Sequence, residues 1–221
     1  MSAVPGEGLP AEISAVPGLG RAPVEEEPAV LAANLNVGVR LFSSAVAFVF
    51  VAFVFAFFYL RAVNSNGQFR PAHVNPAAGI GIAMLVCVLG SVGLFYFARR
   101  SLATGARGAW LAALSVALVL GTAAVVIQIL QYTNYGFSPE SGGYASVFVG
   151  WTAMFLFFWL GAIYWLETFL AQSLRRPPEA QESEITQPLA VMGPSADACI
   201  IYLSLMAGVE VVAYVLLYLV K

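Results

Sequence analysis

The chain has 221 residues, of which 60% are hydrophobic and 10% are charged, and its formal net charge at pH 7 is −2. A soluble domain carries roughly 25% charged residues. This composition excludes an ordinary water-soluble protein and indicates an integral membrane protein.

Five apolar stretches, separated by polar segments, account for this composition. A helix needs about 20 apolar residues to cross a hydrocarbon core about 30 Å thick. Lipid offers the backbone no hydrogen-bond partners, and a helix satisfies those groups internally. We therefore predict an all-α fold, an integral membrane bundle of five transmembrane helices within residues 37–221. The predicted helices cover residues 38–60, 77–98, 109–131, 144–171 and 196–220.

Two polar segments lie outside these helices. Residues 1–36 contain five prolines and the run Glu25 to Glu27, and they have too little apolar surface to offset chain entropy. We predict a disordered cytoplasmic tail there, without a cleavable signal, so that the first membrane helix directs insertion. Residues 172–195 carry Arg175, Arg176 and three glutamates, and we predict a polar loop.

The distribution of Lys and Arg predicts the orientation, because positive residues are retained on the cytoplasmic side. Seven arginines fall on one side of the predicted helices, against two arginines and one lysine on the other. The first group is Arg21, Arg40, Arg99, Arg100, Arg107, Arg175 and Arg176, and the second is Arg61, Arg70 and Lys221. This count predicts a cytoplasmic amino terminus and an external carboxyl terminus.

The sequence shows no set of residues typical of a catalytic or metal site. His73 is the single histidine, and Cys87 and Cys199 lie on different helices without metal-ligand spacing. One histidine cannot ligate two haems or a copper centre. We see no nucleophile beside a base and no pair of membrane carboxylates, so we expect no catalytic residue in this chain.

A few polar residues inside or beside the helices are the candidate contact residues. Arg40 can extend to the lipid headgroups or pair with a partner subunit, and Arg61 closes the first helix. Glu210 lies within the last helix, where a charge should face protein, as an interhelical or intersubunit hydrogen-bonding group or as a proton carrier. Gln131 and Asn134, at the end of the third helix, are suited to interhelical hydrogen bonds.

Side-chain size also predicts which helices lie inside the bundle. Small residues recur every fourth position in the third helix, from Ala109 to Gly121, and in the second helix at Gly79, Ala83 and Cys87. We interpret these as packing seams that place both helices inside. The first helix carries large aromatic rings around its surface, as a helix facing lipid or another subunit would.

The order of these signals is typical of one family. The first helix has Gly38, Leu41, Phe42, Phe58, Leu60 and Arg61, followed by Phe69 and Pro71. The third helix ends in residues 131–138, Gln-Tyr-Thr-Asn-Tyr-Gly-Phe-Ser, and the fourth begins with residues 143–148, Gly-Tyr-Ala-Ser-Val-Phe. The last helix contains residues 209–212, Val-Glu-Val-Val. This pattern resembles the cytochrome c oxidase subunit III family of haem-copper oxidases, in its shorter, five-helix form.

The chain also departs from the family pattern, which identifies it as a divergent member. Val46 stands where the first helix of the family usually has a glutamate, and Asn134 replaces a second glutamate. Residues 154–158 lack the histidines of the fourth helix, and Met206 and Ala207 stand where Trp-His is common. A scaffolding role is therefore the part of the family's function that the resemblance carries over.

The resemblance implies a non-catalytic accessory subunit of a respiratory terminal oxidase with a cytochrome c or quinol donor, in a prokaryotic plasma membrane. Subunit I is the expected main partner, with subunits II and IV and phospholipids beside it, and we expect no nucleic-acid partner. Haems and copper would lie in the partner subunits and none in this chain. The alternatives are a subunit III-like partner of a nitric oxide reductase or another respiratory complex, and a small transporter component.

Overall fold

The computed structural model describes residues 28–64, 69–71, 73–134, 136–175 and 187–220. Most of the predicted tail of residues 1–36 lies outside these ranges, as does the middle of the predicted polar loop of residues 172–195. Every regular element in the described part of the chain is a helix.

Five long helices build the bundle: α1 Pro28–Val63, α2 Ala78–Ala103, α3 Arg107–Thr133, α4 Gly143–Arg175 and α6 Gln187–Tyr214. A short 3₁₀ helix, η2 (Pro139–Ser141), precedes α4, and α6 continues into a π-helical turn, η3 (Val215–Leu219). Five helical spans in the described residues are long and apolar enough to cross a membrane. The predicted all-α class and the five helices are confirmed.

The largest differences from the predicted boundaries are two helix starts. The helix α1 begins at Pro28 rather than at residue 38, because proline is tolerated in a first turn and the following Ala and Leu residues favour a helix. The helix α6 begins at Gln187 rather than at residue 196, so that Pro194 lies inside it. The predicted polar loop of residues 172–195 includes this proline, because an internal proline removes a backbone hydrogen bond of a helix.

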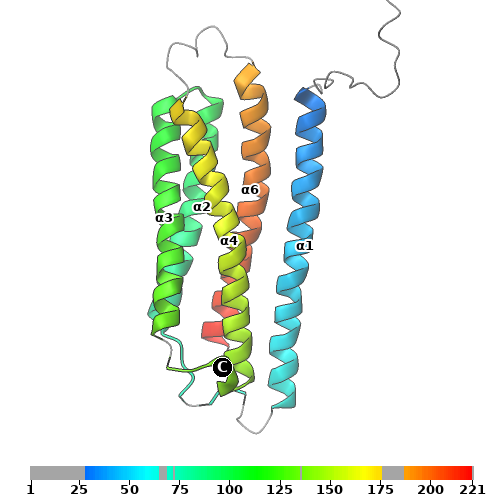
Figure 1. Cartoon of the computed structure of the whole chain (residues 1–221), viewed down its shortest axis with the longest axis vertical. Helices are drawn as coiled ribbons and strands as arrows, with labels where there is room; N and C mark the ends of the chain where they lie inside the picture. The colour runs from blue at the N-terminus through cyan, green and yellow to red at the C-terminus, as the bar shows by residue number, and fades with distance from the viewer. Residues whose placement is uncertain (1–27, 65–68, 72, 135, 176–186, 221) are drawn as a thin grey trace, which may run out of the picture.

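The helix α6 lies between the other helices, as Figure 1 shows, and contacts α1, α2 and α4. The helices α2 and α3 pack against each other on one side of it, and α1 lies on the opposite side, against α6 and α4. The prediction that α2 and α3 form the inside of the bundle is therefore wrong. Small residues bring those two helices together, but the central positions belong to α6 and α4.

The two predicted seams differ in the structure. In α3, Ala113, Ala117 and Gly121 are buried, and the carbonyl of Ala117 accepts a 2.7 Å hydrogen bond from the Ser91 hydroxyl of α2. In α2, Gly79 and Ala83 are exposed. The buried face of α2 is formed instead by Gly81, Met84, Val88, Ser91, Val92, Phe95, Ala98 and Ser101. Spacing alone could not tell these two faces of α2 apart.

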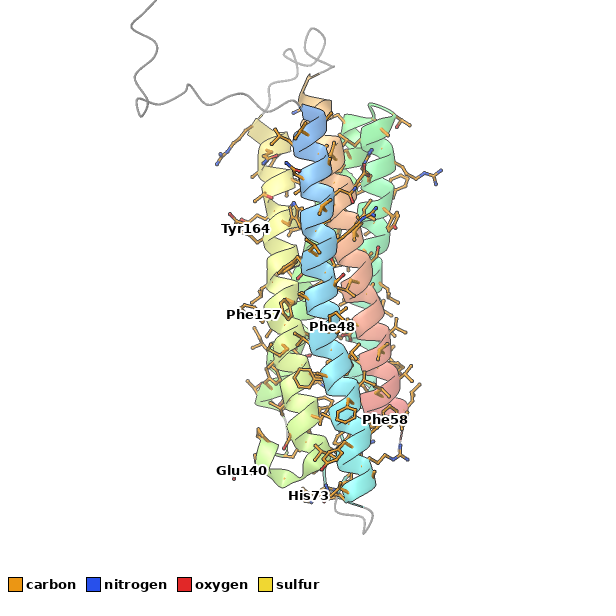
Figure 2. The ribbon with its side chains drawn as sticks, turned by 90° about the vertical axis from the view of Figure 1, so that its right-hand side faces the viewer. Phe48, Phe58, His73, Glu140, Phe157 and Tyr164 are labelled. Atoms are coloured by element: carbon orange, nitrogen blue, oxygen red, sulfur yellow. The ribbon has the colours of Figure 1, made fainter. Side chains whose placement is uncertain are left out.

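The helix α1 buries one face and exposes large aromatic rings on the other. Its buried residues recur at helical spacing and include Val46, Phe50 and Phe57. The exposed set includes Phe48, which is 74% exposed, and Phe55, which is 70% exposed. Figure 2 views the bundle from the side of α1, with Phe48 and Phe58 on that helix and Phe157 and Tyr164 on the neighbouring α4.

Candidate functional site

Polar side chains from three helices meet near the carboxyl-terminal end of the chain. The Gln131 amide of α3 donates a 2.7 Å hydrogen bond to the Tyr218 hydroxyl of η3. The Tyr218 hydroxyl also lies within electrostatic range of Glu210, Tyr132 and Tyr214. We call Gln131, Glu210, Tyr214 and Tyr218 the Tyr218 cluster.

Glycine at position 81 makes room for the tyrosine ring at the centre of this cluster. A methyl group at Gly81 of α2 would lie 2.7 Å from Cζ of Tyr218, well inside van der Waals contact. The ring of Tyr218 also stacks on Tyr214, with centroids 5.6 Å apart, and meets Phe148 edge-on. The π-helical register of η3 therefore places Tyr218 between α2, α3 and α4. Such π-helical turns are frequent at functional sites.

Tyr144, at the start of α4, connects the loop after α1 to the end of the chain. Its hydroxyl donates a hydrogen bond to the backbone carbonyl of Leu217, and its backbone N–H donates one of 2.9 Å to the carbonyl of Phe69. The guanidinium of Arg70 lies 4.4 Å from the centre of the Tyr144 ring, in a cation–π arrangement. The Gly-Tyr start of the fourth helix thus contacts two distant segments, the loop after α1 and η3.

Two buried groups near this end have unmet hydrogen-bonding capacity. Gln128, one turn before Gln131 on the same face of α3, is 0% exposed, and neither polar atom of its side chain has a partner. Glu210 of α6 is 5% exposed, and among the described residues none donates a hydrogen bond to its carboxyl group. The second side-chain polar atom of Gln131, Oε1, also lacks a partner.

A second group of polar contacts closes the opposite end of the bundle. The guanidinium of Arg99, near the end of α2, makes two hydrogen bonds of 2.7 and 2.9 Å to the carboxylate of Asp197 in α6. The Trp110 indole of α3 donates a 2.8 Å hydrogen bond to the Ser173 hydroxyl of α4, and Arg107 donates one of 3.1 Å to the carbonyl of the same serine. These contacts join four of the five long helices.

The predicted contact residues divide into two groups. Arg40, Arg61 and Asn134 are exposed, and the Asn134 amide donates a local 2.7 Å hydrogen bond to the carbonyl of Leu130. Gln131 and Glu210 are buried within this chain and lie in the Tyr218 cluster. Gln131 makes an interhelical hydrogen bond, and the lipid or subunit contacts of these residues stay a prediction.

The described residues contain no group of three or more His, Cys, Asp or Glu side chains that could hold a metal ion. His73 is exposed, Cys199 is buried, and both cysteines are free thiols. The polar contacts described above for the two ends are hydrogen bonds, an ion pair and a cation–π contact.

Sequence inspection missed several of the residues that make these contacts. Asp197 lies in the first turn of the predicted helix 196–220 and Ser173 lies in the predicted polar loop, and neither was singled out. Arg70 and Tyr144 lie far apart in sequence, so their contact could be inferred only from the fold. Arg99 and Asp197 have opposite charges, and both lie near predicted helix ends on one side of the membrane. This was the one signal that could have paired two of these residues.

Comparisons with known proteins identify the family of this chain. The family model for cytochrome c oxidase subunit III matches residues 25–176. Cytochrome c oxidase subunit 3 of Struthio camelus and that of Gallus gallus are each 29% identical to this chain over 120 residues, and that of Coturnix japonica is 28% identical. The alignments cover 52% of this chain and 46% of each relative, so the matched segment spans less than half the length of these relatives. With a family match over most of its length and five helices able to span a membrane, this chain is a multi-pass membrane protein that belongs to the cytochrome c oxidase subunit III family.

Proposed function

We propose that this chain is an accessory subunit of a respiratory haem-copper oxidase, and that it packs against the haem-bearing subunit I. The observation that carries the proposal is the subunit III family match over residues 25–176. The chain would add contact surface and bound lipid to the complex and support its proton uptake. The haems and copper of the complex would be held by the partner subunits.

The composition of the exposed surface supports a protein partner beside α1. This helix exposes aromatic side chains, which are enriched at protein interfaces. They are Phe42, Phe48, Phe55, Phe58 and Tyr59. The large exposed hydrophobic residues of α3 are all aliphatic, as lipid contact alone would allow. They are Val116, Val119, Val126, Ile129 and Leu130. We therefore place the contact with subunit I on the aromatic face of α1.

The charges at the two ends support the proposed orientation. Arg99, Arg107 and Arg175 lie at the end of the bundle where α1 begins. Positive residues favour the cytoplasmic side, so this end would face the cytoplasm of a prokaryotic cell. Arg40 and Arg61 would contact lipid headgroups or partner subunits near the two membrane surfaces, and Asn134 would do so beside the second.

Gentle purification of the tagged full-length chain from its native membrane tests the proposal. We expect oxidase subunits I and II to copurify, with the redox spectrum of haem and an oxygen-consuming activity. A matched preparation from cells that express the untagged chain controls for non-specific capture. Isolation as a haem-free protein without oxidase polypeptides would overturn the proposal, and copurification with nitric oxide reductase subunits would favour that complex instead.

A further inference from the structure

Arg40 carries a charge on the outer surface of α1, within the span that is long and apolar enough to cross a membrane. Among the described residues, none forms a hydrogen bond or ion pair with its guanidinium group. The proposed function leaves this side chain two contacts, lipid headgroups near a membrane surface or a partner subunit. The depth of Arg40 in the bundle distinguishes between them.

Contacts across four helices give the depth of this part of α1. The ring centroids of Phe42 on α1 and Tyr202 on α6 lie 5.5 Å apart. The Tyr202 hydroxyl donates a 2.7 Å hydrogen bond to the carbonyl of Phe158 on α4. The indole of Trp159, the next residue of α4, donates a 3.0 Å hydrogen bond to the carbonyl of Gly121 on α3. Phe42 and Gly121 therefore lie at similar depths.

Gly121 marks the middle of a membrane-spanning helix. It lies about 21 Å of helical rise from the start of α3 at Arg107 and about 18 Å from its end at Thr133. Arg40 precedes Phe42 by only about 3 Å of rise. A hydrocarbon core about 30 Å thick, centred on α3, therefore includes the level of Arg40. Arginines reach the headgroups from near helix ends, so this depth favours an anionic partner inside the membrane.

The face of α1 around Arg40 is shaped for a neighbouring helix. Ser44 and Phe48 follow Arg40 at intervals of four residues, so the three side chains share one exposed face. The small Ser44 side chain, whose hydroxyl donates a 2.8 Å hydrogen bond to the Arg40 carbonyl, allows another helix to approach closely. An arginine matches a carboxylate with two parallel hydrogen bonds, and charged side chains inside membranes pair with one another. Charge complementarity therefore requires Asp or Glu on that helix.

We propose that Arg40 forms an ion pair within the membrane with an Asp or Glu side chain on a transmembrane helix of the subunit that packs on the aromatic face of α1. This inference rests on the proposed function, because the carboxylate belongs to that subunit. The pair adds a directional contact to an otherwise apolar surface, and thereby sets the register of the two helices.

Photo-cross-linking from position 44 identifies what lies against Arg40. The full-length tagged chain carries a photoreactive phenylalanine analogue in place of Ser44 and is irradiated in its native membrane. We expect an adduct with a partner polypeptide, mapped by mass spectrometry to a transmembrane segment that contains Asp or Glu. The matched control carries the analogue in place of Val119, which is 66% exposed and lies at a similar depth on α3. It should give lipid adducts only.

Substitution of Arg40 tests the charge itself. Arg40→Met keeps an unbranched side chain without the charge, and should lower the haem that copurifies per chain several-fold. Arg100→Met, at an exposed position near the end of α2, should leave it unchanged. The amide variant of the mapped partner carboxylate should cause the same loss, and combining it with Arg40→Met should add no further loss.

The outcomes separate this inference from the proposed function. Lipid adducts alone from position 44, in a complex that still contains the oxidase subunits, would overturn the ion pair and leave the accessory role intact. A mapped segment without Asp or Glu, or an unchanged haem content in Arg40→Met, would also overturn it. Purification of the wild-type chain without oxidase polypeptides would overturn the proposed function itself. The cross-linking result holds even if Arg40→Met fails to assemble, because that chain retains Arg40.

Discussion

The Gln131 amide of α3 donates a 2.7 Å hydrogen bond to the Tyr218 hydroxyl of η3, although 87 residues separate them in the sequence. This contact holds η3 against the last turn of α3. Interhelical hydrogen bonds in membrane proteins contribute about 0.6 kcal/mol on average and up to about 1.7 kcal/mol. Gln131 is buried and the bond is part-buried, so we expect a value of about 1 kcal/mol, between the average and the maximum.

A double-mutant cycle of Gln131→Leu and Tyr218→Phe measures this contact. We expect a coupling energy of about 1 kcal/mol in the free energy of unfolding, because each single variant removes the same bond. The measurement is thermal or denaturant unfolding of the purified complex. Asn134→Ala, which removes an exposed local bond on the same helix, is the control and should change stability by less than about 0.5 kcal/mol. Additive single-variant effects would contradict the hydrogen bond.

Replacing Gln128 by leucine should not lower the stability, unlike the same replacement of Gln131 one turn away. Its side chain is completely buried and its polar atoms have no partners, so the folded state has lost their hydration without replacing it. Gln128→Leu keeps a similar volume and should leave the stability unchanged or raise it by about 1 kcal/mol. The comparison with Gln131→Leu in the same unfolding assay is the check. A loss of more than about 1 kcal/mol would reveal a hydrogen-bond partner of Gln128.

The contrast between these glutamines marks what the sequence could predict. Apolar length predicted five helices, since lipid allows few other solutions. A separation of three residues puts Gln128 and Gln131 on one face of α3. The partner of Gln131, however, depends on the π-helical register of η3, which has no sequence signal that we could identify. Likewise, the buried face of α2 depends on packing against α3 and α6, and the start of α6 before Pro194 has no local signal in the sequence.

Two glycines on α2 allow a matched test of the packing around Tyr218. At Gly81 an added methyl group would lie 2.7 Å from the Tyr218 ring, whereas at Gly79 nothing lies within 4 Å. Gly81→Ala should lower the free energy of unfolding by about 1 to 3 kcal/mol, because the ring is held by Gln131 and cannot move freely. Gly79→Ala should be neutral or stabilise the helix by up to about 1 kcal/mol. Equal effects of the two substitutions would contradict the close packing.

The ion pair between Arg99 and Asp197 should contribute modestly and depend on salt. The two side chains are 24% and 51% exposed, so solvent screens their attraction despite the two-point geometry. A cycle of Arg99→Ala and Asp197→Ala should give a coupling energy of about 0.5 to 1 kcal/mol at low salt, falling as ionic strength rises. Arg100→Ala, at the exposed neighbouring position, should give no coupling with Asp197→Ala. A coupling energy that does not change with salt would contradict an exposed ion pair.

The aromatic face of α1 should carry the contact with the partner subunit, and this prediction rests on the proposed function. Phe48 is 74% exposed on α1, and Phe97 is 56% exposed on α2. Phe48→Ala removes no buried contact within the chain, so a loss of copurified haem per chain would report the interface and not the fold. We expect such a loss for Phe48→Ala, several-fold when it is combined with Phe55→Ala, because aromatic anchors dominate interface energies.

Phe97→Ala is the matched control, since it truncates an equally large exposed ring on a helix that does not contact α1 closely. Its haem content per chain should equal that of the wild type, and thermal unfolding should be unchanged in both variants. The reverse result, with loss of haem on Phe97→Ala and none on Phe48→Ala, would move the interface to α2. The aromatic rings of α1 would then face lipid. Whether a helix exposes aromatic or aliphatic side chains would no longer distinguish subunit-facing from lipid-facing helices.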